Sequence, residues 1–369
     1  MATMRDIQNI VERWAPREIA WKDDNPGLQS GDPSARVRGI LVTLDVTEKV
    51  IDEARRAGMN LILSHHPLIF KPVRSVSAEN EMGRCLHALA KSDITLVSAH
   101  TNLDFTRGGT SFALAEKLGI RDVEFLATPY QIQKKIVTFV PATHVKQVVD
   151  AMATAGAGII GNYDLCSFRV EGTGTFRGNA DARPVIGSRG REETVREVRV
   201  EMIVPSWNTA NVIRALIEAH PYEEVAYDLY PLENRSSSYG MGVIGTLPKM
   251  LKARAFLTMV KRRLAVRTLR AGNDLNRTVN RVALCGGSGS DLIDEAIHKG
   301  ADAFVTADVK YHAFHHAAGK IMLVDAGHYE TEIPVVRVMT GRLEAELHRR
   351  GENIPLRAVA FSTNPIRYM

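Results

Sequence analysis

The chain has 369 residues, of which 45% are hydrophobic and 24% charged, so it can bury at least one full core and is not a disordered, collagen-like or coiled-coil protein. Lys and Arg number 47 against 42 Asp and Glu, and because neither sign forms a long block, no specific nucleic-acid partner is expected. Charges interrupt the amino-terminal segment and no apolar run approaches a membrane span, so the sequence predicts a cytoplasmic protein without membrane contact.

Short apolar runs alternate with amphipathic helical runs from residue 37 onward, and the same alternation resumes near residue 280. Continuous apolar strands with helical crossovers are typical of a buried parallel sheet. The sequence therefore predicts a layered α/β domain with a mostly parallel sheet, in which the two halves of the chain share one layer.

The segment between these halves, residues 134–232, has a different character and contains an imperfect repeat. A strand, a Val-Pro pair and a helix occur in that order twice, and each copy leads to a further strand. This pattern predicts an inserted α+β domain of ferredoxin-like type. The predicted boundaries are 1–126 and 233–369 for the two halves of the α/β domain and 127–232 for the inserted domain.

Metal-ligating side chains follow three of the predicted strands. His65 and His66 end the first, Asp104 lies shortly after the second, and His328 and Glu332 follow the third. Ligands of open parallel sheets gather at the carboxyl ends of the strands, and a mixture of imidazole and carboxylate suits intermediate divalent metals. The sequence therefore predicts a metal site built from these five residues.

Five donors exceed the needs of one tetrahedral ion and suit two ions that share a carboxylate. Adjacent histidines in an extended strand point apart, which favours one ion for each of His65 and His66, although a local turn would let both bind a single ion. A single ion and a purely structural role of the histidines stay open. His328 is expected on the loop after its strand, with Thr331 as the cap of a helix whose first turn holds Glu332 and Pro334.

Three further residues are candidates for substrate binding or proton transfer, namely Lys310, His312 and His100. His315 and His316 are interpreted as solvated helix residues. The glycine-rich loop at residues 285–290 can hold an anion through its amides, but an ordinary turn between strand and helix explains it equally well.

Together these motifs resemble the NIF-three-like family, whose members are often called GTP cyclohydrolase 1 type 2 homologues. The resemblance is carried by the segments at residues 64–67, 98–104, 308–312 and 327–332, and by residues 24–29 near the amino terminus. The inserted segment resembles a nitrogen-regulator or CutA-like domain through residues 156–163 and 220–224. The resemblance implies a dinuclear site on the five named residues, with Glu332 as the bridge, and a toroidal homohexamer.

The leading hypothesis is a metal-dependent hydrolase that uses two divalent ions per subunit on a small, nucleotide-like substrate. Zinc, iron, manganese and cobalt all fit the donors. The alternative hypothesis is a metal-handling or regulatory binding protein without turnover, because a set of ligands alone does not establish catalysis.

Overall fold

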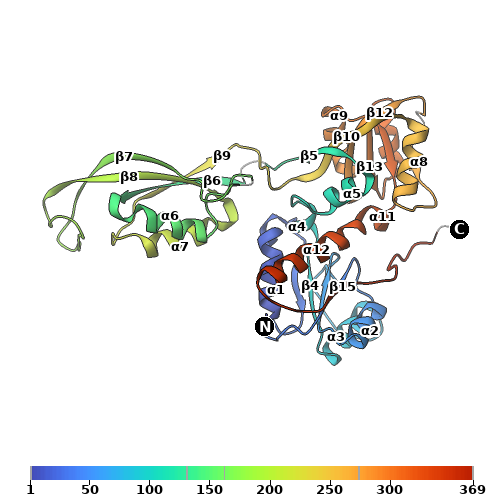
Figure 1. Ribbon diagram of the computed structural model, residues 1–369, viewed down its shortest axis with the longest axis horizontal. Helices are drawn as coiled ribbons and strands as arrows, with labels where there is room; N and C mark the ends of the chain where they lie inside the picture. The colour runs from blue at the N-terminus through green and yellow to red at the C-terminus, as the bar shows by residue number, and fades with distance from the viewer. Residues whose placement is uncertain (1, 130–131, 162, 273–274, 368–369) are drawn as a thin grey trace. The chain divides into compact units, whose positions relative to one another are not determined.

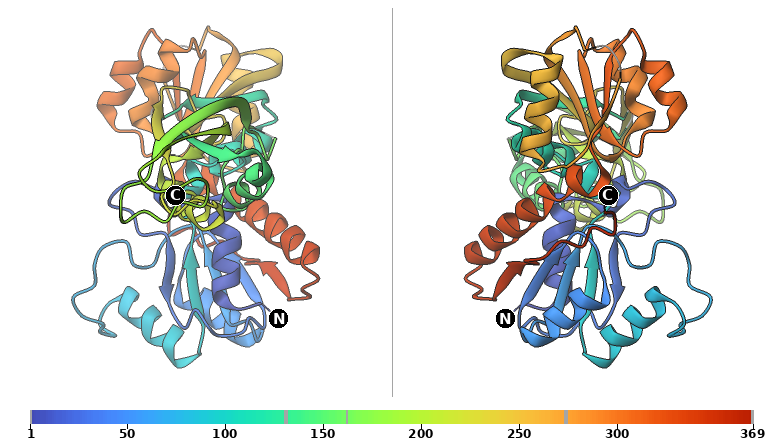
Figure 2. Two further views of the ribbon diagram at one scale, coloured as in Figure 1. Left: turned by 90° about the vertical axis from the view of Figure 1, so that its left-hand side faces the viewer. Right: turned by 90° about the vertical axis from the view of Figure 1, so that its right-hand side faces the viewer.

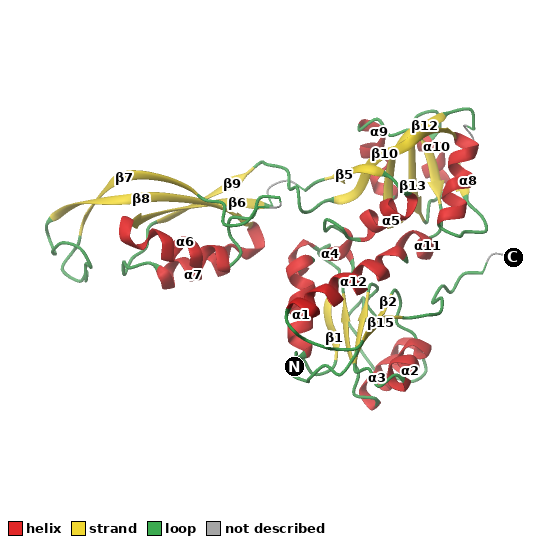
Figure 3. Cartoon of the chain, in the orientation of Figure 1, coloured by secondary structure: helices red, strands yellow, loops and turns green. Residues whose placement is uncertain are grey.

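The computed structural model describes residues 2–129, 132–161, 163–272 and 275–367, and it shows a mixed α/β protein with several sheets (Figure 3). The chain forms two compact units. Unit 1 comprises residues 1–127 and 239–369, and unit 2 comprises residues 128–238. The second boundary lies at 238/239 rather than at 232/233, because the segment after the last strand of unit 2 is irregular.

The first sheet of unit 1 has the strand order β1-β4-β3-β2-β15. Strands β4, β3, β2 and β15 run parallel, and β1 pairs with β4 in the antiparallel sense. Apolar side chains from both faces of these short strands are buried, so helices cover each face. The elements are β1 (Gly27–Ser30), β2 (Ile40–Thr43), β3 (Leu61–Ser64), β4 (Thr95–Ser98) and β15 (Leu356–Ala358), with α2 (Glu48–Arg56) and α3 (Glu81–Lys91) on one face and α1 (Met4–Trp14) and α12 (Pro334–Arg349) on the other.

The second sheet of unit 1 has the order β11-β14-β13-β12-β10-β5 and is parallel only across β12, β13 and β14. Its strands are β5 (Arg121–Ala127), β10 (Met241–Lys252), β11 (Arg270–Ala271), β12 (Thr278–Ser288), β13 (Ala303–Ala307) and β14 (Met322–Asp325). Helices α5 (Thr110–Leu118) and α8 (Ala253–Arg263) cover one face, and α9 (Ile293–His298) and α10 (Tyr311–Ala317) cover the other. The short helices of unit 1 are α4 (Thr101–Asp104), α11 (His328–Glu332) and the 3-10 turns η1 (Arg17–Ile19) and η4 (Ser290–Leu292).

The expectation that both halves share one layer was wrong, because each sheet is separate (Figure 2). The halves are instead interlocked by two exchanged strands. Strand β5, from the first half of the chain, pairs with β10 at the edge of the second sheet. Strand β15, from the end of the chain, pairs in parallel with β2 in the first sheet. Apolar periodicity identifies a strand but not its partner, which explains the error.

Unit 2 has the element order β-α-β-β-α-β of ferredoxin-like units. Its four strands form an antiparallel sheet with the order β7-β8-β6-β9 (Figure 1). Both helices pack on one face of this sheet, where they bury a separate apolar core. The elements are β6 (Gln133–Pro141), η2 (Ala142–His144), α6 (Val145–Thr154), β7 (Phe168–Arg177), β8 (Glu192–Pro205), η3 (Ser206–Asn208), α7 (Thr209–Ala219) and β9 (Tyr227–Leu232).

Among the helices of the described residues, none combines the length and apolar character needed to cross a bilayer.

Because unit 2 has its own apolar core, we expect a substitution in that core to destabilise unit 2 and not unit 1. Leu216 is fully buried in that core, so Leu216→Ala should destabilise unit 2 by about 2–5 kcal/mol. The neighbouring Ile217 is 47% exposed, and Ile217→Ala should change stability by about 0.5 kcal/mol or less. Hydrogen exchange measured peptide by peptide should show faster exchange in β6 and β8 for the first variant only. Equal acceleration in the strands of unit 1 would contradict separate cores.

Candidate metal centre

The five residues of the predicted ligand set, His65, His66, Asp104, His328 and Glu332, come from both sheets of unit 1. The two adjacent histidines follow β3 in a bend. Asp104 is the last residue of α4, which follows β4, and His328 and Glu332 are the first and last residues of α11, which follows β14. All five follow the carboxyl ends of parallel strands, but these strands lie in two sheets rather than along the single sheet edge that the sequence predicted.

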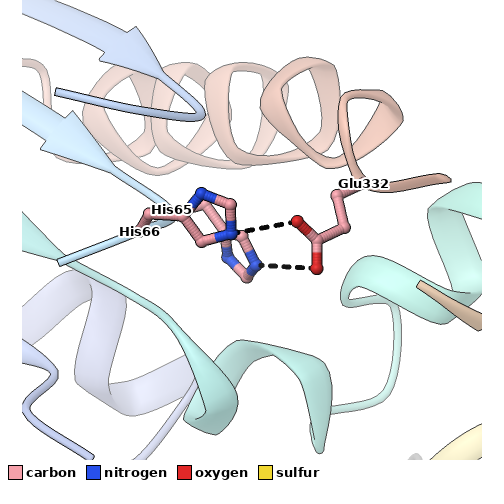
Figure 4. Close-up of side chains that lie close together, drawn as sticks. All are labelled: His65, His66 and Glu332. Atoms are coloured by element: carbon pink, nitrogen blue, oxygen red, sulfur yellow. Dashed lines mark ion pairs between the residues drawn. The ribbon is translucent and has the colours of Figure 1, made fainter. Parts of the chain in front are cut away.

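The carboxylate of Glu332 is the centre of this set. Its Oε2 atom lies 3.0 Å from Nε2 of His66 and 3.0 Å from Nε2 of His328. Its Oε1 atom lies 3.9 Å from Nε2 of His65, which is itself 3.6 Å from Oδ1 of Asp104. One ligand atom from each of His65, His66 and Glu332 lies within 4.8 Å of the other two (Figure 4). The two carboxylate oxygens therefore face different members of the set.

Two atoms of the ligand set are buried without a hydrogen-bond partner in the described part of the chain. They are Nε2 of His65 and Oδ1 of Asp104, which lie 3.6 Å apart. Buried polar atoms are nearly always hydrogen-bonded, so unpaired atoms that converge on one another need another explanation. Imidazole nitrogen and carboxylate oxygen are donors that divalent metals of intermediate softness accept, and the residues present therefore fit a metal centre.

Each imidazole is held through its other nitrogen. Nδ1 of His65 lies 2.8 Å from the carbonyl oxygen of Ala99, and because a carbonyl only accepts, this histidine carries its proton on Nδ1 and its lone pair on Nε2. Nδ1 of His66 lies 2.7 Å from Oδ1 of Asp45. Hydrogen bonds of this kind fix ring orientation in metal sites.

His328 is held in the same way, with its Nδ1 atom 2.7 Å from Oδ2 of Asp308. Asp308 also accepts a hydrogen bond of 2.5 Å from the hydroxyl of Ser288. Its backbone φ of 52° lies in the left-handed region, which aspartate tolerates better than most residues. The end of β13 thus orients a ligand that follows β14.

The three histidines titrate very differently in the metal-free chain. Burial lowers the pKa of His65 to about 3. Burial also acts to lower the pKa of His66, but hydrogen bonds and charges from Asp45 and Glu332 outweigh it and raise the value to about 10. The same balance, with Glu332 and Asp308 as partners, raises the pKa of His328 to about 9.

The two carboxylates are shifted in opposite directions. Burial and the nearby charge of Glu332 raise the pKa of Asp104 to about 7. Burial also acts to raise the pKa of Glu332, but hydrogen bonds and charges from His328, His66 and His65 bring it well below the usual range. Glu332 is therefore the permanent anion of the site, and Asp104 is the group that gives up a proton near neutrality.

The predicted location of His328 on a loop was wrong. His328 begins α11 with Gly327 before it, so it and Glu332 share one helical face at i, i+4 spacing. The prediction placed Glu332 and Pro334 in the first turn of one helix. In the structure Glu332 ends α11, and Pro334 begins a second helix, α12. Thr331 caps neither helix and instead donates its hydroxyl to the carbonyls of Gly327 and His328.

The glycine-rich loop packs against the site and does not present its first amides to an anion. The amide of Gly286 donates to Ser111 and that of Gly287 donates to Thr331. Gly287 has a φ of 64°, and a Cβ atom there would lie 2.1 Å from Oε1 of Glu332. Glycine is thus required because the loop approaches the central carboxylate closely.

The three candidate catalytic residues lie in different surroundings. The ring of His100 is adjacent to the ligand set, with its centroid 5.5 Å from that of His65 and 5.6 Å from that of His66. Lys310 and His312 are exposed at the start of α10, and within the described ranges no hydrogen bond or ion pair joins either to the ligand set. His316 is also exposed and pairs with Asp294 at 2.6 Å, in keeping with a surface role.

Sequence reasoning missed the carboxylates that orient the imidazoles. Asp45 follows β2 just as His65 follows β3, so the strand-end rule would have found it had that strand been included. Asp24 accepts from Nδ1 of His100 at 2.7 Å and from the amide of Thr101 at 3.0 Å. It belongs to a segment that carried the family resemblance, but nothing in its spacing indicated a contact 76 residues away.

The pKa values predict that metal binding expels protons. At pH 8 both His66 and His328 are protonated in the metal-free chain, and ligation requires neutral imidazole, so filling the site with Zn²⁺ should release about two protons. Release should fall as the pH rises through the two pKa values, about 9 and about 10, and should disappear well above them, where both rings are already neutral. Calorimetric titration in buffers of different ionisation enthalpy measures this number. His328→Gln should lower the number of protons released by about one. A release that does not depend on pH would contradict the pKa values given for His66 and His328.

Comparison with known proteins relates nearly the whole chain to one family. The model of the Duf34/NIF3 (NGG1p interacting factor 3) family matches residues 2–365. A protein of Halalkalibacterium halodurans named GTP cyclohydrolase 1 type 2 homolog is 39% identical over 371 residues, which cover 100% of both chains. A Bacillus subtilis protein of the same name is 38% identical over 367 residues, which cover 99% of this chain and 98% of that protein.

Solved structures agree with the sequence comparison. The crystal structure of a Bacillus cereus protein related to NIF3 is similar with a TM-score of 0.87 at 39% identity, covering 100% of this chain and 99% of that chain. A Staphylococcus aureus protein is similar with a TM-score of 0.80 at 29% identity and the same coverage. The chain therefore belongs to the Duf34/NIF3 family.

Proposed function

We propose that the ligand set holds two divalent metal ions and that the protein is a metal-dependent hydrolase of a small, nucleotide-like substrate. The observation that carries the proposal is the pair of differently directed oxygens on Glu332. Oε1 faces His65, with Asp104 beside it, and Oε2 faces His66 and His328. The five donors thus divide into two groups joined by one carboxylate, as a bridged pair of ions requires.

Bound ions would supply two kinds of chemistry, a lowered pKa for a coordinated water and stabilisation of negative charge that develops on a substrate oxygen. The protein supplies the orientation. Hydrogen bonds from Nδ1 fix the imidazoles and leave their Nε2 atoms for the metal ions.

His100 is the residue we propose for proton transfer. Its ring lies beside the ligand set, and Asp24 holds its Nδ1 atom at 2.7 Å. A carboxylate in this position orients the ring, which is the support that a general base needs. The exposed positions of Lys310 and His312 suit contact with a substrate more than a proton transfer inside the site.

The substrate class is proposed from the names of the relatives. The Halalkalibacterium halodurans and Bacillus subtilis proteins are named GTP cyclohydrolase 1 type 2 homologs, which makes GTP the first compound to test. The alternative is a metal-handling or regulatory binding protein without turnover, because a set of metal ligands alone does not establish catalysis. The homohexamer stays a prediction from the family resemblance.

Metal retention should depend on the anchoring carboxylates. Asp45→Asn keeps the ligand His66 but weakens the group that orients it, so affinity for Zn²⁺ should fall about 10- to 100-fold. Asp294→Asn is a matched control because Asp294 makes the same kind of hydrogen bond to His316 on the surface, away from the ligand set. Elemental analysis and competition with a chelator measure the Zn²⁺ content and the Zn²⁺ affinity of both variants. Equal losses in the two variants would remove the support for a metal centre.

A measurement of turnover distinguishes the hydrolase from the metal-handling protein. Metal-loaded protein incubated with GTP should release formate and a ring-opened product, detected by mass spectrometry. Asp104→Ala should lower the rate at least about 100-fold, because it removes one of the five proposed metal ligands. If no product forms, and Asp104→Ala behaves as the unaltered protein does, the hydrolase proposal fails for GTP. Transfer of bound metal to an acceptor protein would then support metal handling.

A further inference from the structure

Unit 2 contains a cavity of about 910 Å³ that lies outside the metal centre and has no part in the function proposed above. This volume is in the range of small-molecule sites. In unit 2 the β7–β8 hairpin extends past the ends of α6 and α7 (Figure 1), and the cavity lies along that hairpin. Residues 222–224, which belong to a segment that carried part of the family resemblance, form one of its walls.

The face of the sheet that lines the cavity is opposite the helices. Val140 and Val200 point into the core with α6 and α7, so the alternate residues Phe139, Arg199 and Glu197 point the other way. Gly172 is paired with Glu197 in the register of the hairpin, and a Cβ atom there would meet nothing within 4 Å. The missing side chain in the middle of β7 leaves open space above the sheet.

The segment at residues 220–224, which includes this wall, is hydrogen-bonded to the sheet. His220 is buried, with Nε2 3.0 Å from the carbonyl oxygen of Phe139, and its Nδ1 accepts from the amide of Tyr222 at 3.1 Å. The ring of Tyr222 is 5.0 Å from that of His220 and 6.4 Å from that of Phe176. Its hydroxyl oxygen is buried beside the carboxylate of Glu197. Phe139, Phe176 and Tyr222 thus give the cavity an aromatic lining.

The loop between β7 and β8 closes the cavity from another side. The amide of Gly190 donates to the carbonyl of Gly178 at 2.7 Å, which closes the base of this loop. The amide of Arg183 donates to Oε1 of Glu223 at 2.5 Å and joins the loop to the wall that holds Tyr222. Three chain segments therefore define the cavity, and hydrogen bonds connect them.

Negative charge predominates around the cavity. The carboxylates among its lining residues are Asp181, Glu197, Glu223 and Glu224, and the guanidinium groups are Arg177 and Arg199. Glu171 also lines the cavity, but it pairs with Val198 of the helix-side core, so its side chain points to the other face of the sheet. Both arginines are already paired with carboxylates outside the lining, Arg177 with Glu192 at 3.2 Å and Arg199 with Glu201 at 2.9 Å. Within the described residues, none of the lining carboxylates forms an ion pair with a basic side chain.

We propose that this cavity binds an organic ammonium ion, with its positive charge among the carboxylates and its apolar body against Phe139, Phe176 and Tyr222. Aromatic faces attract cations, and a desolvated contact of this kind contributes more than an exposed one. A carboxylate such as Glu197, next to the rings, adds direct charge complementarity. An anionic ligand would meet the negative charges of these carboxylates and is disfavoured.

Calorimetric titration of the full-length protein with benzyltrimethylammonium tests the proposal, and phenylacetate serves as a ring of similar size with the opposite charge. The ammonium ion should bind saturably at one site per chain, and phenylacetate should not bind. Raising the salt concentration should weaken binding, since part of the attraction is between charges. Equal affinity for both compounds, or no binding of the ammonium ion, would overturn the proposal.

Two variants locate the site. Glu197→Gln removes one charge and should weaken binding about tenfold, and Gly172→Leu places a side chain in the open space and should abolish binding. Gly172 does not have a positive φ, so the backbone there accepts leucine. Glu218→Gln, on the exposed surface of α7, is the matched control and should bind as the unaltered protein does. Unchanged affinity in both cavity variants would place any binding elsewhere.

Discussion

The architecture of unit 1 depends on one costly placement, the carboxylate of Glu332, which is only 4% exposed. A buried carboxylate is stable only when cations or hydrogen-bond donors surround it. In the metal-free chain, protonated His66 and His328 meet this need from a distance of 3.0 Å each. Metal ions would replace these protons, so the same arrangement that stabilises the empty chain prepares it for ligation.

The interlocking of the two sheets follows from the same constraint. The ligands come from β3, β4 and β14, which lie in different sheets, so the sheets have to be held in register for the donors to meet. Strands β5 and β15 each leave their own half of the chain and pair with the other sheet. Helix α12 continues directly from the ligand helix α11 and packs on the first sheet, which connects the site to a large apolar core.

Unit 2 differs from unit 1 in its sheet, its core and the side chains on its surface. Its core is separate, its sheet is antiparallel, and its outer face carries charged and aromatic side chains instead of metal ligands. A chain with a metal centre in one unit and a cation-selective cavity in the other would have two sites of different chemistry. Each site is made entirely of residues from its own unit.

The sequence by itself determined which residue types stand at the strand ends and therefore the five candidate ligands, because a parallel strand places the next residues at a known edge of its sheet. It also determined the repeat in unit 2, since strand and helix periodicities are local properties. Tertiary structure alone decided that the α/β layer is two interlocked sheets, because partner choice between strands depends on contacts distant in sequence. It also decided that Asp45, Asp24 and Asp308 orient imidazoles, since a single aspartate looks the same in the sequence whether it contacts solvent or a histidine many residues away.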